Sequence, residues 1–207
     1  MKYITQTTLI IGLLLFGCYR VNSKTTSATD DKVEIQNLIR QVLKWSSSKK
    51  SINLLPVLTD SKGRSYIGFD LDKHKSNLHD LRETNFFSTV FIENYNQIIL
   101  TLDKKLRNKE FDEWLVGELP TFIFANDVNP WCSCQDNPDG ELVVVDITSL
   151  KSNYGELNWK WGNLSSDNDP SWKEFSYKFR VVKENDKWKI DYMEGFDFKE
   201  CTRKDGL

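Results

Sequence analysis

The segment that most constrains the fold of this chain is YKFRVVKENDKWKIDYM, residues 177–193. Apolar and polar residues alternate on both sides of Asn185 and Asp186, which is the pattern of two half-buried strands. Asn and Asp both tolerate a positive φ, so this pair suits a two-residue hairpin turn. The segment therefore predicts a β-hairpin near the end of the chain.

This turn also fixes a register, which gives the hairpin one apolar face and one charged face. The predicted cross-strand pairs are Glu184 with Lys187, Val181 with Ile190, Phe179 with Tyr192, and Arg180 with Asp191. Aromatic, aliphatic and opposite-charge pairs of this kind stabilise a sheet. A shift by one residue would lose both faces, so we expect this register.

Earlier segments predict helices first and further strands later. Apolar residues recur at helical spacing over residues 32–45, 72–83 and 88–108, and we expect Asp31 to cap the first helix, with Glu34 in capping-box spacing. After Gly140 the period changes to two, which predicts strands at 141–147, 155–162 and 172–182. Helices followed by an antiparallel meander predict an α+β fold.

The N-terminus has the composition of a targeting segment. An apolar run from Leu9 to Phe16, broken only by Gly12, follows Lys2 and precedes a polar stretch, residues 21–30. The run is far shorter than the about 20 residues of a bilayer span, and it fits the core of a signal peptide. It has no polar face, and the polar stretch after it cannot pack, so a buried N-terminal helix is disfavoured.

The residues Leu15-Phe16-Gly17-Cys18 resemble the bacterial lipobox, in which a small residue precedes the lipidated cysteine. The resemblance implies a signal peptide at 1–17, an acylated Cys18 and a membrane anchor through that lipid. Residues 18–30 would then be a flexible tether and residues 31–207 a single α+β domain. By the same resemblance, the protein would sit in the cell envelope, on the outer membrane facing the periplasm.

The order of elements and the ending FRVVKENDKWKIDYMEGFDF, residues 179–198, resemble uncharacterised envelope lipoproteins with a nuclear-transport-factor-2-like domain. The resemblance implies N-terminal helices packed on a curved antiparallel sheet, which forms a cone with a pocket at its mouth. Relatives with this fold include enzymes, ligand-binding proteins and interaction domains, so the fold does not choose a function.

Three cysteines remain if Cys18 carries lipid, and an oxidising envelope favours a disulfide among them. A bond between Cys132 and Cys134 spans one residue, over which the usual Cα separation is hard to meet. Cys201 follows the last strand and is the expected mate of either one. No histidine lies near them, so we expect no metal site. His74 and His79, five residues apart on one helix, are expected to face solvent.

Six residues are candidates for binding a ligand. The loop NDVNPWCSCQD, residues 126–136, holds Asp127 and Trp131, and it is either a pocket lip or a turn-rich connector with Trp131 in the core. Asp127 and Asp136 of this loop are also candidates for a carboxylate pair, although nothing in the sequence fixes their separation. The others lie on the expected aromatic face of the sheet, where they either pack or line a pocket: Tyr154, Trp159, Trp161 and Tyr177.

Composition and motifs exclude several classes of function. The net charge is −2 with no dominant basic patch, so nucleic acid is not an expected partner. No phosphate loop, dinucleotide fingerprint or zinc motif occurs, so we expect no cofactor. We therefore expect a non-enzymatic envelope protein that binds a small ligand or a protein partner at the cone mouth. The alternative is a periplasmic hydrolase or isomerase that uses a carboxylate in the cone pocket.

One observation separates these two hypotheses. An enzyme of this kind needs a polar pocket that holds a carboxyl group with a raised pKa. A protein that binds another protein should instead expose a patch of apolar side chains and have a closed core.

Overall fold

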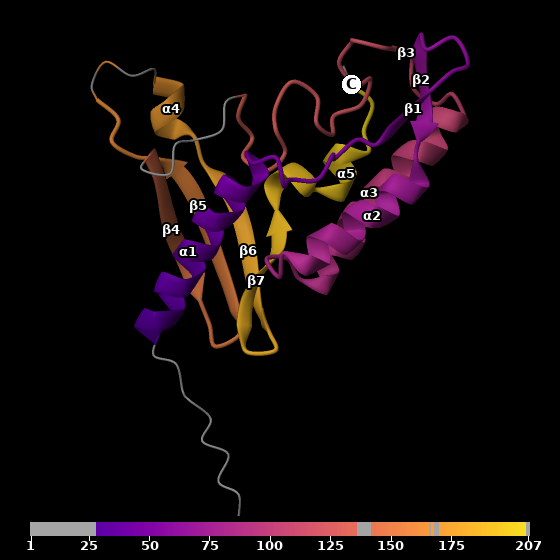
Figure 1. Ribbon diagram of the computed structural model, residues 1–207. Coiled ribbons are helices and arrows are strands. Elements are labelled where there is room, and N and C mark those ends of the chain that lie inside the picture. Colours follow the sequence, from indigo (N-terminus) through magenta and orange to yellow (C-terminus); the bar gives the residue numbers. More distant parts are fainter. Residues whose placement is uncertain (1–27, 136–141, 166, 168–169, 206–207) are drawn as a thin grey trace, which may run out of the picture.

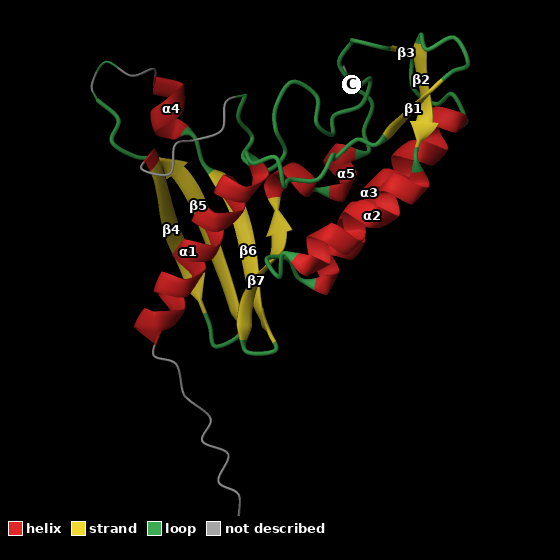
Figure 2. Cartoon of the chain, viewed as in Figure 1, coloured by secondary structure: helices red, strands yellow, loops and turns green. Residues whose placement is uncertain are grey.

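The structure is a computed structural model that describes residues 28–135, 142–165, 167 and 170–205 (Figure 1). It confirms the predicted α+β class, because helices pack against two separate antiparallel sheets (Figure 2). The helical elements in the described ranges are α1 (Ala28–Ser46), α2 (Leu71–Glu83), α3 (Thr89–Arg107), α4 (Pro170–Glu174), the 3-10 turn η2 (Glu194–Phe196) and α5 (Phe198–Cys201). In this part of the chain no helix is both long enough and apolar enough to cross a bilayer.

The larger sheet has four strands in chain order: β4 (Val143–Leu150), β5 (Tyr154–Trp161), β6 (Tyr177–Glu184) and β7 (Lys187–Met193). Helix α1 lies across one face of this sheet (Figure 1) and buries Ile35, Ile39 and Val42 against it. The sheet is open and does not curl around the helices, in contrast to the curved sheet that the sequence led us to expect.

The β6–β7 hairpin confirms the predicted turn and the half of the register next to it. Asn185 and Asp186 have φ values of 52° and 60°. The observed pairs nearest the turn are Glu184 with Lys187, Lys183 with Trp188, Val182 with Lys189, and Val181 with Ile190. Beyond them the register shifts, so that Arg180 pairs with Tyr192 and Phe179 with Met193. The predicted pairs Arg180–Asp191 and Phe179–Tyr192 are therefore wrong.

The shift is a bulge at Asp191, whose carboxylate joins two distant parts of the chain. It accepts a hydrogen bond from Arg180 Nε at 2.9 Å and another from Ser88 Oγ at 3.1 Å. The backbone N–H of Ser88 also donates to the carbonyl of Ile190 at 2.8 Å. The segment before α3 thus covers the outer edge of β7. The pattern of the hairpin alone contains no sign of this long-range contact.

The strand predicted over residues 172–182 begins later than expected. Residues 170–174 form the short helix α4, and β6 starts at Tyr177. Pro170 is the first residue of α4, where its fixed φ suits a helix and its missing N–H costs nothing. Trp172 therefore lies on a helix, and alternation in the sequence extended the predicted strand too far.

Asp31 does not cap α1, because the helix already begins at Ala28, within the range expected for the tether. The Asp31 carboxylate is buried beneath the β6–β7 hairpin instead. Its Oδ1 accepts hydrogen bonds from Lys183 Nζ at 2.8 Å and from Trp188 Nε1 at 2.9 Å. These contacts fasten the first turn of α1 to the hairpin, which lies more than 150 residues away in sequence.

The smaller sheet lies at the other end of the molecule from the start of α1 (Figure 1). Its strands are β1 (Val57–Thr59), β2 (Ser65–Phe69) and β3 (Trp114–Leu115), in that order. Helix α3 packs closely against β2 at Gly68, where a Cβ would lie 2.7 Å from Asp103 Oδ1. The same oxygen accepts the backbone N–H of Phe69 at 2.7 Å, so only glycine permits this approach.

Candidate binding surfaces

Trp131 has the packing role that was one of its two predicted alternatives. Its ring is 2% exposed. It lies edge-on to Trp45 with ring centroids 5.2 Å apart, and its centroid is 4.6 Å from that of Phe196. Burial of large aromatic rings contributes strongly to a core. The loop that carries Trp131 is therefore held to the core by this ring.

The four candidates on strands do not gather around one cavity. Trp159 and Tyr177 are opposite each other on β5 and β6, and both are buried. Trp161 is half-buried and stacks on Trp172 of α4, with ring centroids 5.9 Å apart. Tyr154 lies at the other end of β5, where its hydroxyl donates to Glu156 at 2.5 Å. This hydrogen bond is the main cause of the raised pKa of Tyr154.

Asp127, the remaining ligand candidate, is exposed on the loop before Trp131. Its backbone has a φ of 63°, and its carboxylate accepts a hydrogen bond from Gln135 Nε2 at 3.5 Å. Asp136, considered with Asp127 as a carboxylate pair, lies outside the described residues. Cys18, the predicted lipidation site, also lies outside them.

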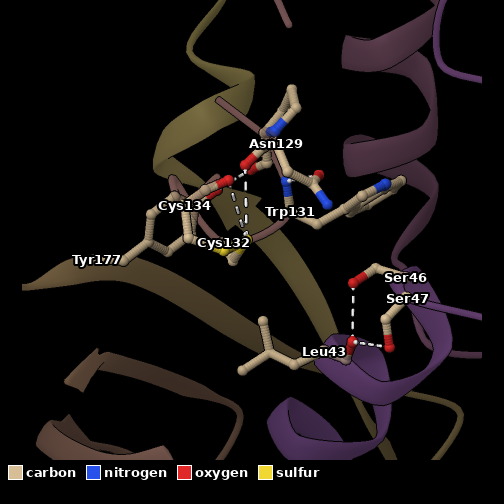
Figure 3. Close-up of a disulfide and its surroundings, with 9 residues drawn as sticks. Leu43, Ser46, Ser47, Asn129, Trp131, Cys132, Cys134 and Tyr177 are labelled. Atoms are coloured by element: carbon tan, nitrogen blue, oxygen red, sulfur yellow. Dashed lines mark hydrogen bonds between the residues drawn. A yellow bond between two sulfur atoms is a disulfide. The ribbon is translucent and has the colours of Figure 1, made fainter. Parts of the chain in front are cut away.

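The disulfide in the described part of the chain joins Cys132 to Cys134 (Figure 3). Their Cα atoms are 5.2 Å apart, within the usual range for disulfides. Ser133, between them, has a φ of 52°, a left-handed conformation that brings the two neighbours to the same side. The sequence prediction disfavoured this pairing as strained and did not anticipate the conformation of Ser133.

Cys201 is a free thiol, so its expected disulfide with Cys132 or Cys134 is wrong. The thiol is 3% exposed and lies 3.3 Å from the carbonyl of Gly195. Burial raises the pKa of the Cys201 thiol, which keeps it protonated. Close by, the hydroxyl of Tyr177 donates to the carbonyl of Pro130 at 2.5 Å and accepts the N–H of Gly195 at 2.8 Å. These hydrogen bonds hold the disulfide loop against η2.

His74 is buried, contrary to the expectation that both histidines face solvent, whereas His79 is exposed as predicted. The His74 ring packs edge-on to Tyr95, and its Nε2 lies 3.0 Å from Asn96 Oδ1. Its Nδ1 has no hydrogen-bond partner among the described residues. Burial lowers the pKa of His74. The sequence held a signal for this position, because His74 precedes Leu78 by four residues and so shares its helix face.

The carboxyl groups with clearly shifted pKa values do not behave as general acids. The pKa of Asp60 is lowered, mainly by the hydrogen bond from the backbone N–H of Arg64. The pKa of Asp70 is lowered, mainly by the backbone N–H of Lys73 at the start of α2. A shift in this direction keeps a carboxylate ionised. In the part of the chain that the structure describes, no three metal-ligating side chains form a cluster.

Three cavities are lined by residues other than the predicted ligand residues. One, of about 720 Å³, is formed by the start of α1 and the turns at the same end of the larger sheet, and another, of about 380 Å³, lies on the outer face of that sheet. The third, of about 460 Å³, lies between the end of α3 and the smaller sheet. Aromatic rings from Tyr66, Phe111 and Trp114 line this third cavity.

The outer face of the smaller sheet and the loop after it expose apolar side chains. Ser65 pairs with Leu115 and Tyr66 with Trp114, so Leu115 lies on the face opposite the rings of Tyr66 and Trp114. Ile67 lies at the register shift between β1 and β2 and also lines the third cavity. The exposed fractions are 38% for Leu58, 46% for Ile67, 40% for Leu115, 44% for Val116 and 58% for Leu119. We call these five residues the distal apolar patch.

Comparison of this chain with known protein families, with curated proteins and with solved structures finds no match.

Proposed function

We propose that this protein is a lipid-anchored component of a bacterial cell envelope, whose domain binds another protein and catalyses no reaction. The anchor is the acylated Cys18 that follows the signal peptide, residues 1–17, and the domain faces the periplasm from the outer membrane. Support for the anchor comes from the Leu-Phe-Gly-Cys sequence and from the polar residues between it and α1. Two or more acyl chains suffice for stable anchoring.

We further propose that the domain is a divergent member of the nuclear-transport-factor-2-like class, with an opened sheet. Two features support this relationship. Long helices precede a four-stranded antiparallel meander in the sequence, and α1 lies across one face of that meander (Figure 1). Because proteins with one fold have many functions, this relationship does not identify the function of the domain.

The distal apolar patch is the observation that carries the proposed binding function. Exposed apolar side chains that gather in one region mark an interaction site, and five such residues come from β1, β2, β3 and the loop that follows. Trp131, Trp159 and Tyr177, which were expected at the cone mouth, are packed in the core. They therefore expose less apolar surface to a partner than the distal apolar patch does. The strands that carry most of the patch, β1, β2 and β3, lie at the other end of the molecule from the start of α1, which would leave them accessible in a tethered domain (Figure 1).

Site-specific photocrosslinking in cells tests this function. A photoreactive residue in place of Leu119 should give one discrete adduct with an envelope protein. The control is the same residue in place of Val144, which is 47% exposed on the larger sheet and lies outside the patch. An absent adduct from position 119, or the same adducts from both positions, would refute the proposal. Intact mass measurement of the protein from membranes tests the anchor, because an unmodified Cys18 would exclude it.

A further inference from the structure

The cavity between α3 and the smaller sheet has the composition of a small-molecule site. Its volume of about 460 Å³ lies within the range of about 300–1,000 Å³ that is usual for ligand pockets. The rings of Tyr66 and Trp114 lie with centroids 4.4 Å apart, and Phe111 and Leu106 extend the apolar lining. Such a lining binds a flat apolar body, since aromatic rings contribute large contact areas.

The charged side chains around this cavity differ in whether they already have partners. Asp112 pairs with Lys204 Nζ at 2.9 Å, and Glu113 accepts a hydrogen bond from Ser65 Oγ at 2.6 Å. The two acidic side chains are therefore engaged within the protein. They do not form an open site for a cationic ligand.

The two lining cations retain donors: Arg107 is the last residue of α3, and Lys109 follows the helix by two residues. Arg107 donates Nε–H to Asp103 at 2.8 Å and one Nη2–H to the carbonyl of Phe69 at 3.3 Å. A guanidinium has five N–H donors, so three of them have no partner among the described residues. The backbone N–H of Lys109 donates to the carbonyl of Leu106, but its side-chain ammonium has no hydrogen-bond or ion-pair partner among the described residues. Unengaged cationic donors are thus concentrated at one end of an aromatic cavity.

We propose that this cavity binds a small organic anion with a flat apolar body. The body lies against Tyr66, Trp114 and Phe111, and the acidic group accepts hydrogen bonds from Lys109 and Arg107. This inference goes beyond the proposed protein-binding function and does not depend on it. Ile67 belongs both to the cavity lining and to the distal apolar patch, but the cavity is tested by small probes read at Trp114 and the patch by crosslinking from position 119.

Two probes with the same ring system test the charge requirement: 8-anilino-1-naphthalenesulfonate, an anion, and N-phenyl-1-naphthylamine, its neutral counterpart. The purified domain should bind the anion about three- to fivefold more tightly, the preference expected of an exposed ionic contact. A shift of the indole N–H resonance of Trp114 on addition of the probe should locate binding in this cavity. That N–H donates a hydrogen bond to the carbonyl of Glu118, and its resonance is assigned by its loss in Trp114→Phe.

A matched pair of variants tests which cation is responsible. Lys109→Gln should reduce the preference for the anion to about one, whereas Lys104→Gln should keep it, because Lys104 is exposed on α3 and does not line the cavity. Three results would each overturn the proposal: equal affinity of the wild-type protein for both probes, an unchanged preference in Lys109→Gln, and an unmoved Trp114 resonance at saturation. Each can occur whether or not crosslinking from position 119 succeeds.

Discussion

The two sheets of this protein have opposite kinds of outer face. On the larger sheet, the outward side chains include ion pairs across neighbouring strands, such as Lys160 with Asp146 at 3.3 Å and Arg180 with Asp191 at 2.9 Å. On the smaller sheet, the exposed side chains include Ile67 and Leu115. A charged face is stable in water by itself, whereas an apolar one gains from being covered. The comparison is therefore consistent with the proposal that a partner contacts the smaller sheet.

The largest expected difference between the sheets concerns buried and exposed isoleucines. Ile190→Ala on β7 should lower the free energy of unfolding by about 2–5 kcal/mol, because the side chain is fully buried and leaves a cavity. Ile67→Ala on β2 should change it by less than about 0.5 kcal/mol, as is usual for surface substitutions. Urea denaturation of the wild-type protein and both variants measures these changes in the free energy of unfolding. Equal losses would mean that Ile67 is part of a core, and the comparison would fail.

A second contrast is between two ion pairs of the larger sheet. Asp31→Ala should cost about 3 kcal/mol, since it leaves the Lys183 ammonium with 17% of its side chain exposed and without that carboxylate. Asp146→Ala should cost less than about 1 kcal/mol, because both partners of that pair are about half exposed. The double variant Asp31→Leu/Lys183→Met should lose less than Asp31→Ala alone. If it loses more, the attraction itself is what stabilises α1.

Acid should weaken the region beside the smaller sheet through His74. The folded-state pKa of this histidine is lowered by burial, so the unfolded chain takes up the proton first. Stability should therefore be complete above the ordinary histidine pKa of about 6.5 and decline as pH falls below it. His74→Gln should flatten this decline, and His79→Gln should not. A decline that persists in His74→Gln would assign the pH dependence to other groups.

The variant with the smallest expected change in stability, Ile67→Lys, tests the proposed binding function. Ile67→Lys should alter the free energy of unfolding by less than about 0.5 kcal/mol, because the side chain is 46% exposed. It should nevertheless abolish the crosslinked adduct from position 119 by placing a charge in the distal apolar patch. Thermal melts and crosslinking of one sample measure both effects. An adduct of undiminished yield would show that the partner does not contact β2.

The sequence alone predicted the elements whose causes are local. Periodic apolar residues identified α1, α2, α3 and the strands of the larger sheet, because each period is a property of a short segment. Asn185 and Asp186 determined the hairpin turn and the pairs beside it, up to Val181 with Ile190. The sequence also identified Trp131 as a possible core residue.

Only the tertiary structure decided features that depend on distant partners. Asp31 follows the pattern of a helix cap, yet it is buried because Lys183 and Trp188 reach it from the other end of the chain. The bulge at Asp191 likewise depends on Ser88. The unengaged donors of Arg107 and Lys109, and the exposed apolar side chains of Ile67 and Leu115, depend on which neighbours the fold supplies. Local patterns determine what each segment forms, and long-range contacts determine which side chains remain available for binding.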